Sequence, residues 1–144
     1  MIKGLLDKGA IPVLERMIQF AAERHRVLAH NIANISTPYF KPKDINTDSF
    51  QESLREAVSR RRTHKNPLAG PLQVPGTREV QFKDGLIQVR PSFINENIMF
   101  HDRNNRALER IMQDLAENTL AHKSGIEMLR NEFDMLRTAI RERV

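Results

Sequence analysis

The sequence predicts a mainly α fold in which long N-terminal and C-terminal helices pair as an antiparallel, coiled-coil-like hairpin. Two apolar series, one near each end of the chain, repeat at alternating steps of three and four residues, the period of a helix that packs on another helix. Five of the seven prolines lie between Pro38 and Pro75 and separate the two series. The expected parts are 1–48 with the first helix, a connector over 49–100, and 101–144 with the last helix.

The first helix is predicted to cover about Ile11 to Asn34. Pro12 suits a first helical turn, and Pro38 ends the helical stretch because the residue before a proline disfavours the α conformation. Seven of the eight residues of its seam are apolar. The seam consists of Ile11, Leu14, Ile18, Ala21, His25, Leu28, Ile32 and Ile35.

The last helix is predicted to cover about Asn105 to Arg141. At 1.5 Å per residue it would be roughly 55 Å long, which is longer than the first helix can cover. The uncovered length must therefore pack on Met1–Lys8 or on another molecule. Eight of its ten seam residues are apolar: Leu108, Met112, Leu115, Thr119, His122, Ile126, Leu129, Phe133, Leu136 and Ile140.

The connector is expected to be partly disordered, with a short helix and a small β-hairpin. Phe50, Leu54, Ala57 and Val58 have helical spacing, and Asp48 with Gln51 forms a candidate capping box. The arginines of the basic run Arg60–Lys65 would then lie at the negative end of the helix.

The β-hairpin is predicted from Asp84-Gly85, because this dipeptide accepts the backbone angles of a tight two-residue turn. Such a turn pairs Phe82 with Ile87 and also pairs Val80 with Val89, so the apolar residues share one face. An isolated hairpin of this size is barely stable in water, and its apolar face must dock elsewhere.

Composition and motifs argue against an enzyme and against a bound cofactor. The 144 residues include no cysteine, and we find no glycine-rich phosphate loop and no nucleophile elbow. His25 and His122 lie in the two seams, where they form either a polar layer that fixes the helix register or metal ligands without a third ligand nearby. In an antiparallel pair, His25 comes level with Asn118 or Thr119.

The segment before the last helix has two interpretations. Asp102, Asn104 and Asn105 resemble a fragment of a calcium loop, but the central glycine and the distal glutamate of an EF-hand are missing. We therefore expect these residues to cap the helix, and we expect no metal site.

The net charge of +5 suits a nucleic acid, an acidic membrane or an acidic protein partner. No aromatic residues interleave with the basic run, so no nucleic-acid partner is expected. No apolar stretch is long enough for a membrane-spanning helix, and the N-terminus lacks the features of a cleaved signal peptide.

The end of the first helix resembles a known family. The segment Val27–Pro38 reads Val-Leu-Ala-His-Asn-Ile-Ala-Asn-Ile-Ser-Thr-Pro and is similar to the signature of flagellar rod and hook axial proteins, an Asn-x-Ala-Asn-x-x-Thr core after a long amphipathic helix. The segment His101–Asn105, followed by Leu115–Leu120, resembles the C-terminal pattern of the short proximal rod subunits. The family usually has glycine or asparagine after Thr-Pro, where this chain has Tyr39.

The resemblance implies a structural subunit of the proximal rod in the flagellar basal body. Implied partners are copies of the chain, other rod proteins, the junction protein between rod and MS ring, and the type III export apparatus. The alternatives are the sibling short rod subunit and, from another class, a basic helical nucleic-acid-binding protein. The expected assembly interface consists of Leu14, Ile18, Ala21, Leu28, Ile32, Leu115, Ile126, Leu129, Phe133 and Leu136. The expected signature turn consists of Asn31, Ala33, Asn34, Thr37 and Pro38.

Within that turn, Asn34 is expected to satisfy the end of the helix, because asparagine tolerates left-handed geometry and hydrogen-bonds nearby backbone groups. Thr37-Pro38 is expected to make the chain leave in an extended direction.

Overall fold

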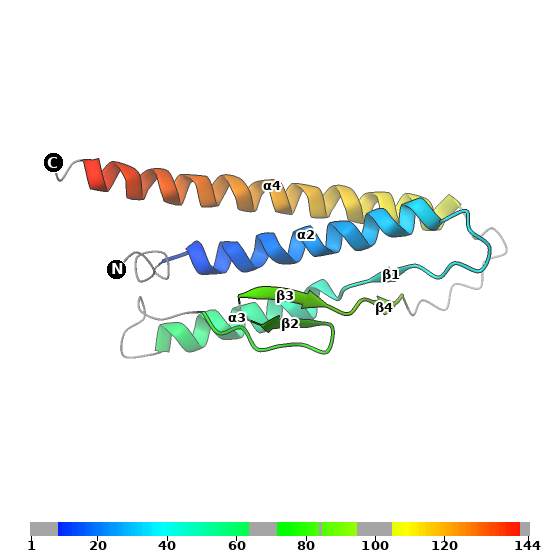
Figure 1. Cartoon of the computed structure of the whole chain (residues 1–144), viewed down its shortest axis with the longest axis horizontal. Helices are drawn as coiled ribbons and strands as arrows, with labels where there is room; N and C mark the ends of the chain where they lie inside the picture. The colour runs from blue at the N-terminus through cyan, green and yellow to red at the C-terminus, as the bar shows by residue number, and fades with distance from the viewer. Residues whose placement is uncertain (1–8, 64–71, 84, 95–104, 142–144) are drawn as a thin grey trace.

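A computed structural model describes residues 9–63, 72–83, 85–94 and 105–141 of the protein. Its elements along the chain are α2 (Ile11–Asn34), β1 (Lys43–Asp44), α3 (Thr47–Thr63), β2 (Val80–Lys83), β3 (Leu86–Val89), β4 (Ser92–Phe93) and α4 (Asn105–Arg141). Three layers result, with α2 between α4 on one side and α3 with the strands on the other (Figure 1). The predicted mainly α fold with two long paired helices is confirmed.

Both long helices have the predicted bounds. Gly9, with a φ angle of 67°, precedes α2, and the carbonyl of Ala10 accepts hydrogen bonds from the amides of Val13 and Leu14. Pro12 lies in the first turn, where its missing N–H leaves no hydrogen bond unmade. The two helices run antiparallel side by side, and α4, with 37 residues against 24, extends past the start of α2 (Figure 1).

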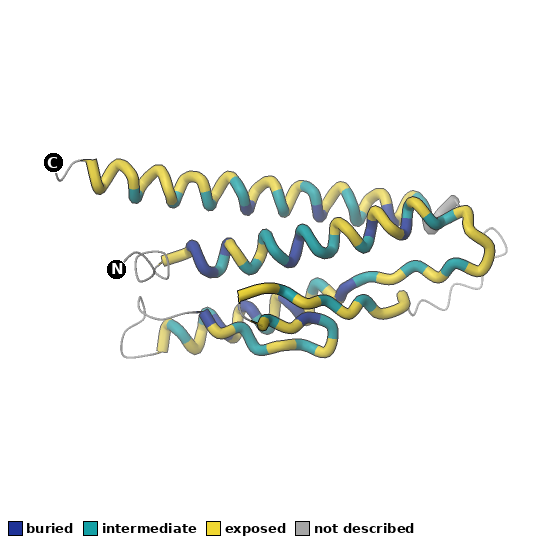
Figure 2. The backbone as a smooth tube through the Cα atoms, in the orientation of Figure 1, coloured by how far each residue is buried: buried dark blue, intermediate teal, exposed yellow. Residues whose placement is uncertain are grey.

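The main apolar core lies between α2 and the connector, on the side of α2 that faces away from α4 (Figure 2). At its centre, the rings of Phe20 and Phe50 stack with centroids 4.0 Å apart. Sequence reasoning assigned one apolar face to α2, whereas the helix uses two. The buried members of the core are Phe20, Ile45, Phe50, Leu54, Ala57, Leu72 and Val80.

The helix of the connector, α3, is longer than expected and begins with a different cap. The side-chain oxygen of Asn46 accepts a hydrogen bond from the amide of Ser49 at 2.8 Å, which identifies Asn46 as the capping residue. The predicted capping box of Asp48 and Gln51 was therefore wrong, because Asp48 already lies inside the first turn. There its charge still complements the positive end of the helix.

The predicted hairpin is confirmed in its register. Val80 pairs with Val89 and Phe82 pairs with Ile87 in the antiparallel ladder of β2 and β3. Gly85 has a φ angle of 81°, which suits glycine in a tight turn, while Asp84 lies outside the described residues. Val80 is 1% exposed in the core, so the apolar face of the hairpin docks on the rest of the chain.

Polar contacts fix the tip of the hairpin to α2. The carbonyl oxygen of Gly85 accepts hydrogen bonds from Arg16 at 2.7 Å and from Gln19 at 3.2 Å. The guanidinium of Arg16 also lies 4.9 Å from the centre of the Phe82 ring. The tip of the hairpin is thus held on the helix.

A second two-stranded sheet was not expected from the sequence. Strands β1 and β4 pair antiparallel, with Lys43 opposite Phe93 and Asp44 opposite Ser92. Glu79 joins this sheet to α3, because its carboxylate accepts hydrogen bonds from the Asn46 amide at 2.7 Å and from the Ser92 hydroxyl. These contacts bring the start and the end of the connector together.

Candidate functional site

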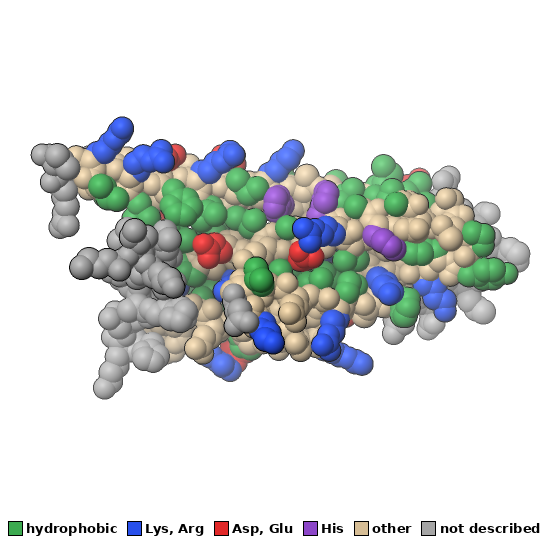
Figure 3. Space-filling view, viewed as in Figure 1, with side chains coloured by type: hydrophobic (Ala, Val, Ile, Leu, Met, Phe, Trp, Pro, Cys, Tyr) green, Lys and Arg blue, Asp and Glu red, His purple; other side chains and the backbone are tan. Residues whose placement is uncertain are grey.

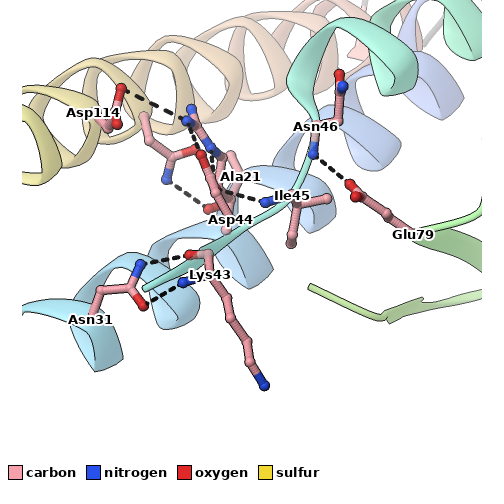
Figure 4. Close-up of polar contacts among 10 residues, drawn as sticks. Ala21, Asn31, Lys43, Asp44, Ile45, Asn46, Glu79 and Asp114 are labelled. Atoms are coloured by element: carbon pink, nitrogen blue, oxygen red, sulfur yellow. Dashed lines mark hydrogen bonds and ion pairs between the residues drawn. The ribbon is translucent and has the colours of Figure 1, made fainter. Parts of the chain in front are cut away.

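The most buried residue of the signature turn is Asn31, which is 1% exposed. Its side-chain nitrogen donates to the carbonyl of Lys43 at 2.6 Å, and its side-chain oxygen accepts from the amide of Lys43 at 3.1 Å (Figure 4). The side-chain amide of Asn31 thus bonds both backbone groups of Lys43, as the backbone of a neighbouring strand would. Lys43 also pairs with Phe93 of β4. The two hydrogen bonds of Asn31 fix the path of the chain after it leaves α2.

Asn34 lies at the last residue of α2, and its side-chain nitrogen donates to the carbonyl of His30 at 2.8 Å. His30 lies one turn earlier in the helix, so its carbonyl also takes part in the i→i−4 backbone bonding of α2, and the Asn34 side chain adds a second donor to it. The backbone then turns through hydrogen bonds from Thr37 to Asn34 and from Phe40 to Thr37. Ala33, Thr37 and Pro38 are exposed.

The left-handed residue of this turn is Tyr39 and not Asn34. Tyr39 has a φ angle of 61°, while Asn34 is helical. The family's usual glycine or asparagine at this position adopts such an angle with less strain than tyrosine. The side chain of Tyr39 is 99% exposed.

A network of one arginine and two aspartates links all three layers (Figure 4). Arg24 of α2 binds both carboxylate oxygens of Asp44 in β1, at 3.0 and 2.7 Å, and lies 3.9 Å from Asp114 of α4. The hydrogen bond to Asp44 raises the pKa of Arg24. Burial raises the pKa of Asp114, and the attraction of Arg24 opposes that rise only in part. Sequence reasoning missed this network, because nothing along the chain brings these three residues together.

Contacts between α2 and α4 correct the predicted seam. The buried residues Ile111, Asn118 and Gly125 each lie one position before a predicted seam residue. Met112, predicted to be in the seam, is 55% exposed. The prediction counted apolar residues, and the helices meet instead along a face that includes a polar and a small residue.

Besides the ion pair of Arg24 with Asp114, Asn118 makes a polar contact between the two helices. Its side chain, 5% exposed, donates to the carbonyl of Ala21 at 2.8 Å. His25 is exposed, so the predicted polar layer at His25 was wrong. A Cβ atom at Gly125 would lie 3.1 Å from a side-chain carbon of Ile18, which shows how closely the helices approach there.

The residues predicted for the assembly interface divide into three groups. Leu14, Ala21 and Leu28 are buried within the chain. Phe133 is 41% exposed. Their role in assembly stays a prediction. The remaining members, Ile18, Ile32, Leu115, Ile126, Leu129 and Leu136, are half-buried.

Helix α4 carries a further apolar surface, and Figure 3 shows hydrophobic side chains along this helix. A shallow groove there is lined by Met112, Leu115, Ala116, Thr119, Leu120 and Lys123. Leu120 is 68% exposed, although leucine on a lone molecule is usually more buried.

The remaining predictions concern caps, metals and membranes. Asn105 is the first residue of α4, while Asp102 and Asn104 lie outside the described residues. Within the described ranges, no three His, Asp or Glu side chains come together as metal ligands. None of the described helices combines the length and the apolar character that crossing a membrane requires.

Two curated proteins are similar to this chain over almost its whole length. The flagellar basal body rod protein FlgB of Bacillus subtilis (strain 168) is 27% identical over 135 residues, which cover 94% of this chain and 95% of that protein. The flagellar basal body rod protein FlgB of Aquifex aeolicus (strain VF5) is 26% identical over 133 residues, which cover 92% of this chain and 94% of that protein. No family model matches the chain, and no solved structure matches it.

Proposed function

We propose that this chain, which is similar along almost its whole length to flagellar basal body rod proteins, is a structural subunit of the proximal rod. The observation that carries the proposal is similarity along 94% of this chain and 95% of a rod protein, with no large segment left over on either side. A protein that shares only a helical motif with a rod subunit would match over a shorter stretch.

Exposed apolar surface on α4 supports assembly by helix packing. Met128, Phe133, Met135 and Ile140 are between 41% and 61% exposed, and the groove around Leu120 adds to them. Large apolar surface on a single molecule marks a site of protein contact. In this proposal, copies of the chain and other rod proteins cover the α4 surface.

The proposal extends to location and transport. The subunits would line the periplasmic rod, which transmits torque and encloses the export channel, and they would meet the junction protein of the MS ring at one end. The chain would travel through the flagellar type III apparatus without a cleaved signal peptide. No catalytic step is assigned to it.

The proposal is tested by deleting the gene in its host and restoring it with the wild-type sequence or with Phe133→Asp. The wild type should restore motility and be present in purified basal bodies, quantified by mass spectrometry against other rod proteins. Phe133→Asp should be produced and exported but incorporated poorly. Arg55→Ala, which removes an exposed side chain of α3, is the matched control and should behave as wild type.

Absence of the wild-type chain from purified basal bodies would overturn the proposal. Binding to duplex DNA that weakens steeply with salt, together with normal motility of the deletion strain, would favour the nucleic-acid alternative instead.

A further inference from the structure

A concavity lies beside the signature turn, where the second half of α2 meets β1 and the link between β3 and β4. Its volume is about 310 Å³. We refer to it as the turn groove. Its lining consists of Arg26, Val27, His30, Asn31, Phe40, Lys43 and Pro91.

The turn groove combines apolar walls with a cationic rim. Val27, Phe40 and Pro91 are half-buried and supply the apolar surface, while Arg26, His30 and Lys43 are exposed. Asn31 is fully engaged with the backbone of Lys43, so its amide is not available to a ligand. None of the lining residues is a carboxylate. A ligand that fits must therefore carry an anionic group next to an apolar one.

Lys43 and Arg26, the lysine and the arginine of the rim, each contact a neighbouring side chain. The ammonium of Lys43 lies 4.9 Å from the centre of the Phe93 ring. Arg26 binds Glu23 at 2.9 Å through one of its five N–H groups, and its side chain is still 76% exposed. Glu23 reduces the local positive charge but leaves further donors of Arg26 able to bind a second carboxylate.

Tyr39 is next in sequence to Phe40, a wall of the turn groove, but is not one of the residues that line it. It is 99% exposed at a φ angle of 61°. A left-handed backbone costs a non-glycine residue about 1 kcal/mol, and strain of this kind concentrates at functional sites. The exposed Tyr39 ring buries almost no surface on its own chain, so its full surface is available to pack on a partner.

We propose that the turn groove, together with Tyr39, is a docking site for an acidic peptide segment of a partner protein. A carboxylate side chain of the peptide binds between Arg26 and Lys43, and a neighbouring apolar side chain packs on Val27, Phe40 and Tyr39. The apolar walls have no complement on a nucleic-acid backbone, and they favour a peptide. The inference goes beyond the proposed function, because it requires no particular assembly.

The test uses the full chain, labelled with ¹⁵N, and a synthetic peptide of sequence acetyl-Leu-Glu-Leu-Asp-Leu-amide as the probe. Backbone amide shifts are followed during titration. The shifts should concentrate at 26–31 and 39–43, and the same peptide with Gln and Asn in place of Glu and Asp should bind about fivefold more weakly, as expected for the loss of exposed ion pairs.

Variants sharpen the test. The double variant Arg26→Gln with Lys43→Gln should weaken binding of the acidic peptide by about fivefold and leave binding of the neutral peptide unchanged. Tyr39→Ala should weaken binding of both peptides. Arg55→Gln, which removes a cation on α3 that is 73% exposed, is the control and should change neither. Circular dichroism and melting temperature verify that each variant folds as the wild type.

Three results would overturn the proposal. One is the absence of shifts at the turn groove, the second is equal affinity for the acidic and the neutral peptide, and the third is displacement of the acidic peptide by a duplex DNA oligonucleotide or by inorganic phosphate at the same concentration.

Discussion

The two halves of α4 carry the same apolar period but lie in different surroundings. In the first half, buried residues recur every seven positions at Ile111, Asn118 and Gly125, and the last two contact α2. In the second half, from 126 to 141, no described side chain is buried. A helical period thus predicts that a face will be covered, but it does not say whether the same chain or another molecule covers it.

The first half also differs in the chemistry of its contacts. It meets α2 through a hydrogen bond from Asn118, a close approach at Gly125 and an ion pair of Asp114. The exposed second half offers mainly methionine and phenylalanine, and methionine adapts to irregular apolar surfaces. Specific pairing within the chain and adaptable surface for neighbours are therefore separated along one helix. Four substitutions test this separation, in order of their expected effect on the free energy of unfolding.

Ile111→Asp should have the largest effect. Ile111 is 3% exposed, and an aspartate there is buried without a designed partner, which costs about 3 kcal/mol or more. Chemical denaturation of the isolated chain, followed by circular dichroism, measures the loss. Ile111→Val is the control and should lose about 1 kcal/mol. If Ile111→Asp lowered the free energy of unfolding by less than Ile111→Val, the first half would not pack on α2 as described.

Gly125→Leu should have an intermediate effect. Even a Cβ atom at this position lies 3.1 Å from Ile18, so a larger side chain pushes α4 away from α2. Overpacking costs about 1 to 3 kcal/mol, and the better helix propensity of leucine offsets roughly 1 kcal/mol of it. The same substitution at exposed Ser124 should cause no loss. Equal stability of the two variants would contradict a close helix approach at Gly125.

Asp114→Asn should have a small effect that depends on pH. Burial raises the pKa of Asp114, so its ionised form lowers stability, and this loss disappears as pH falls through the folded-state pKa. Relative to the variant, the wild type should therefore gain melting temperature between about pH 7 and about pH 4. Asp134→Asn, at a site 71% exposed, should show no such trend. A wild type that loses melting temperature relative to Asp114→Asn would reverse the assigned sign.

Phe133→Asp should leave the free energy of unfolding within about 0.5 kcal/mol of the wild type, because the ring is 41% exposed. Both variants place an aspartate on α4, one in each half of the helix. Paired denaturation curves of the two variants give the most direct comparison of the halves. If Phe133→Asp destabilised the isolated chain as much as Ile111→Asp, the second half would be covered within the chain.

Local signals in the sequence predicted the helices and the hairpin. Gly9, Pro12 and Pro38 act on their own neighbourhood, and the turn predicted from the dipeptide Asp84-Gly85 implies the register of two adjacent strands, so their consequences could be derived without the fold. The second apolar face of α2 also had a signal, because Val13, Phe20 and Val27 recur every seven residues. The prediction followed one series and missed the other.

Contacts between distant segments could not be derived in this way. The pairing of Asn31 with Lys43 and the cap at Asn46 depend on how the chain returns after the signature turn. The link from Arg24 to Asp114 requires three layers to be in place. In the seam of α4, Ile111 is buried and Met112 is exposed, because the buried face also includes Asn118 and Gly125. The residue types of Asn118 and Gly125 do not indicate burial on their own.

The position of α4 at the far end of the chain has a consequence for the order of folding. The contact between Ala21 and Asn118 closes a loop of 97 residues, whereas Phe20 and Phe50 are separated by 50 − 20 = 30. The longer closure costs about 1 kcal/mol more in chain entropy, and distant contacts form late. A chain that emerges with its N-terminus first can therefore assemble α2, α3 and the hairpin while α4 is still free. The helix that docks last, α4, also carries the most exposed apolar surface. Whether that surface packs on its own chain or on a neighbouring molecule is therefore decided in the last step of folding.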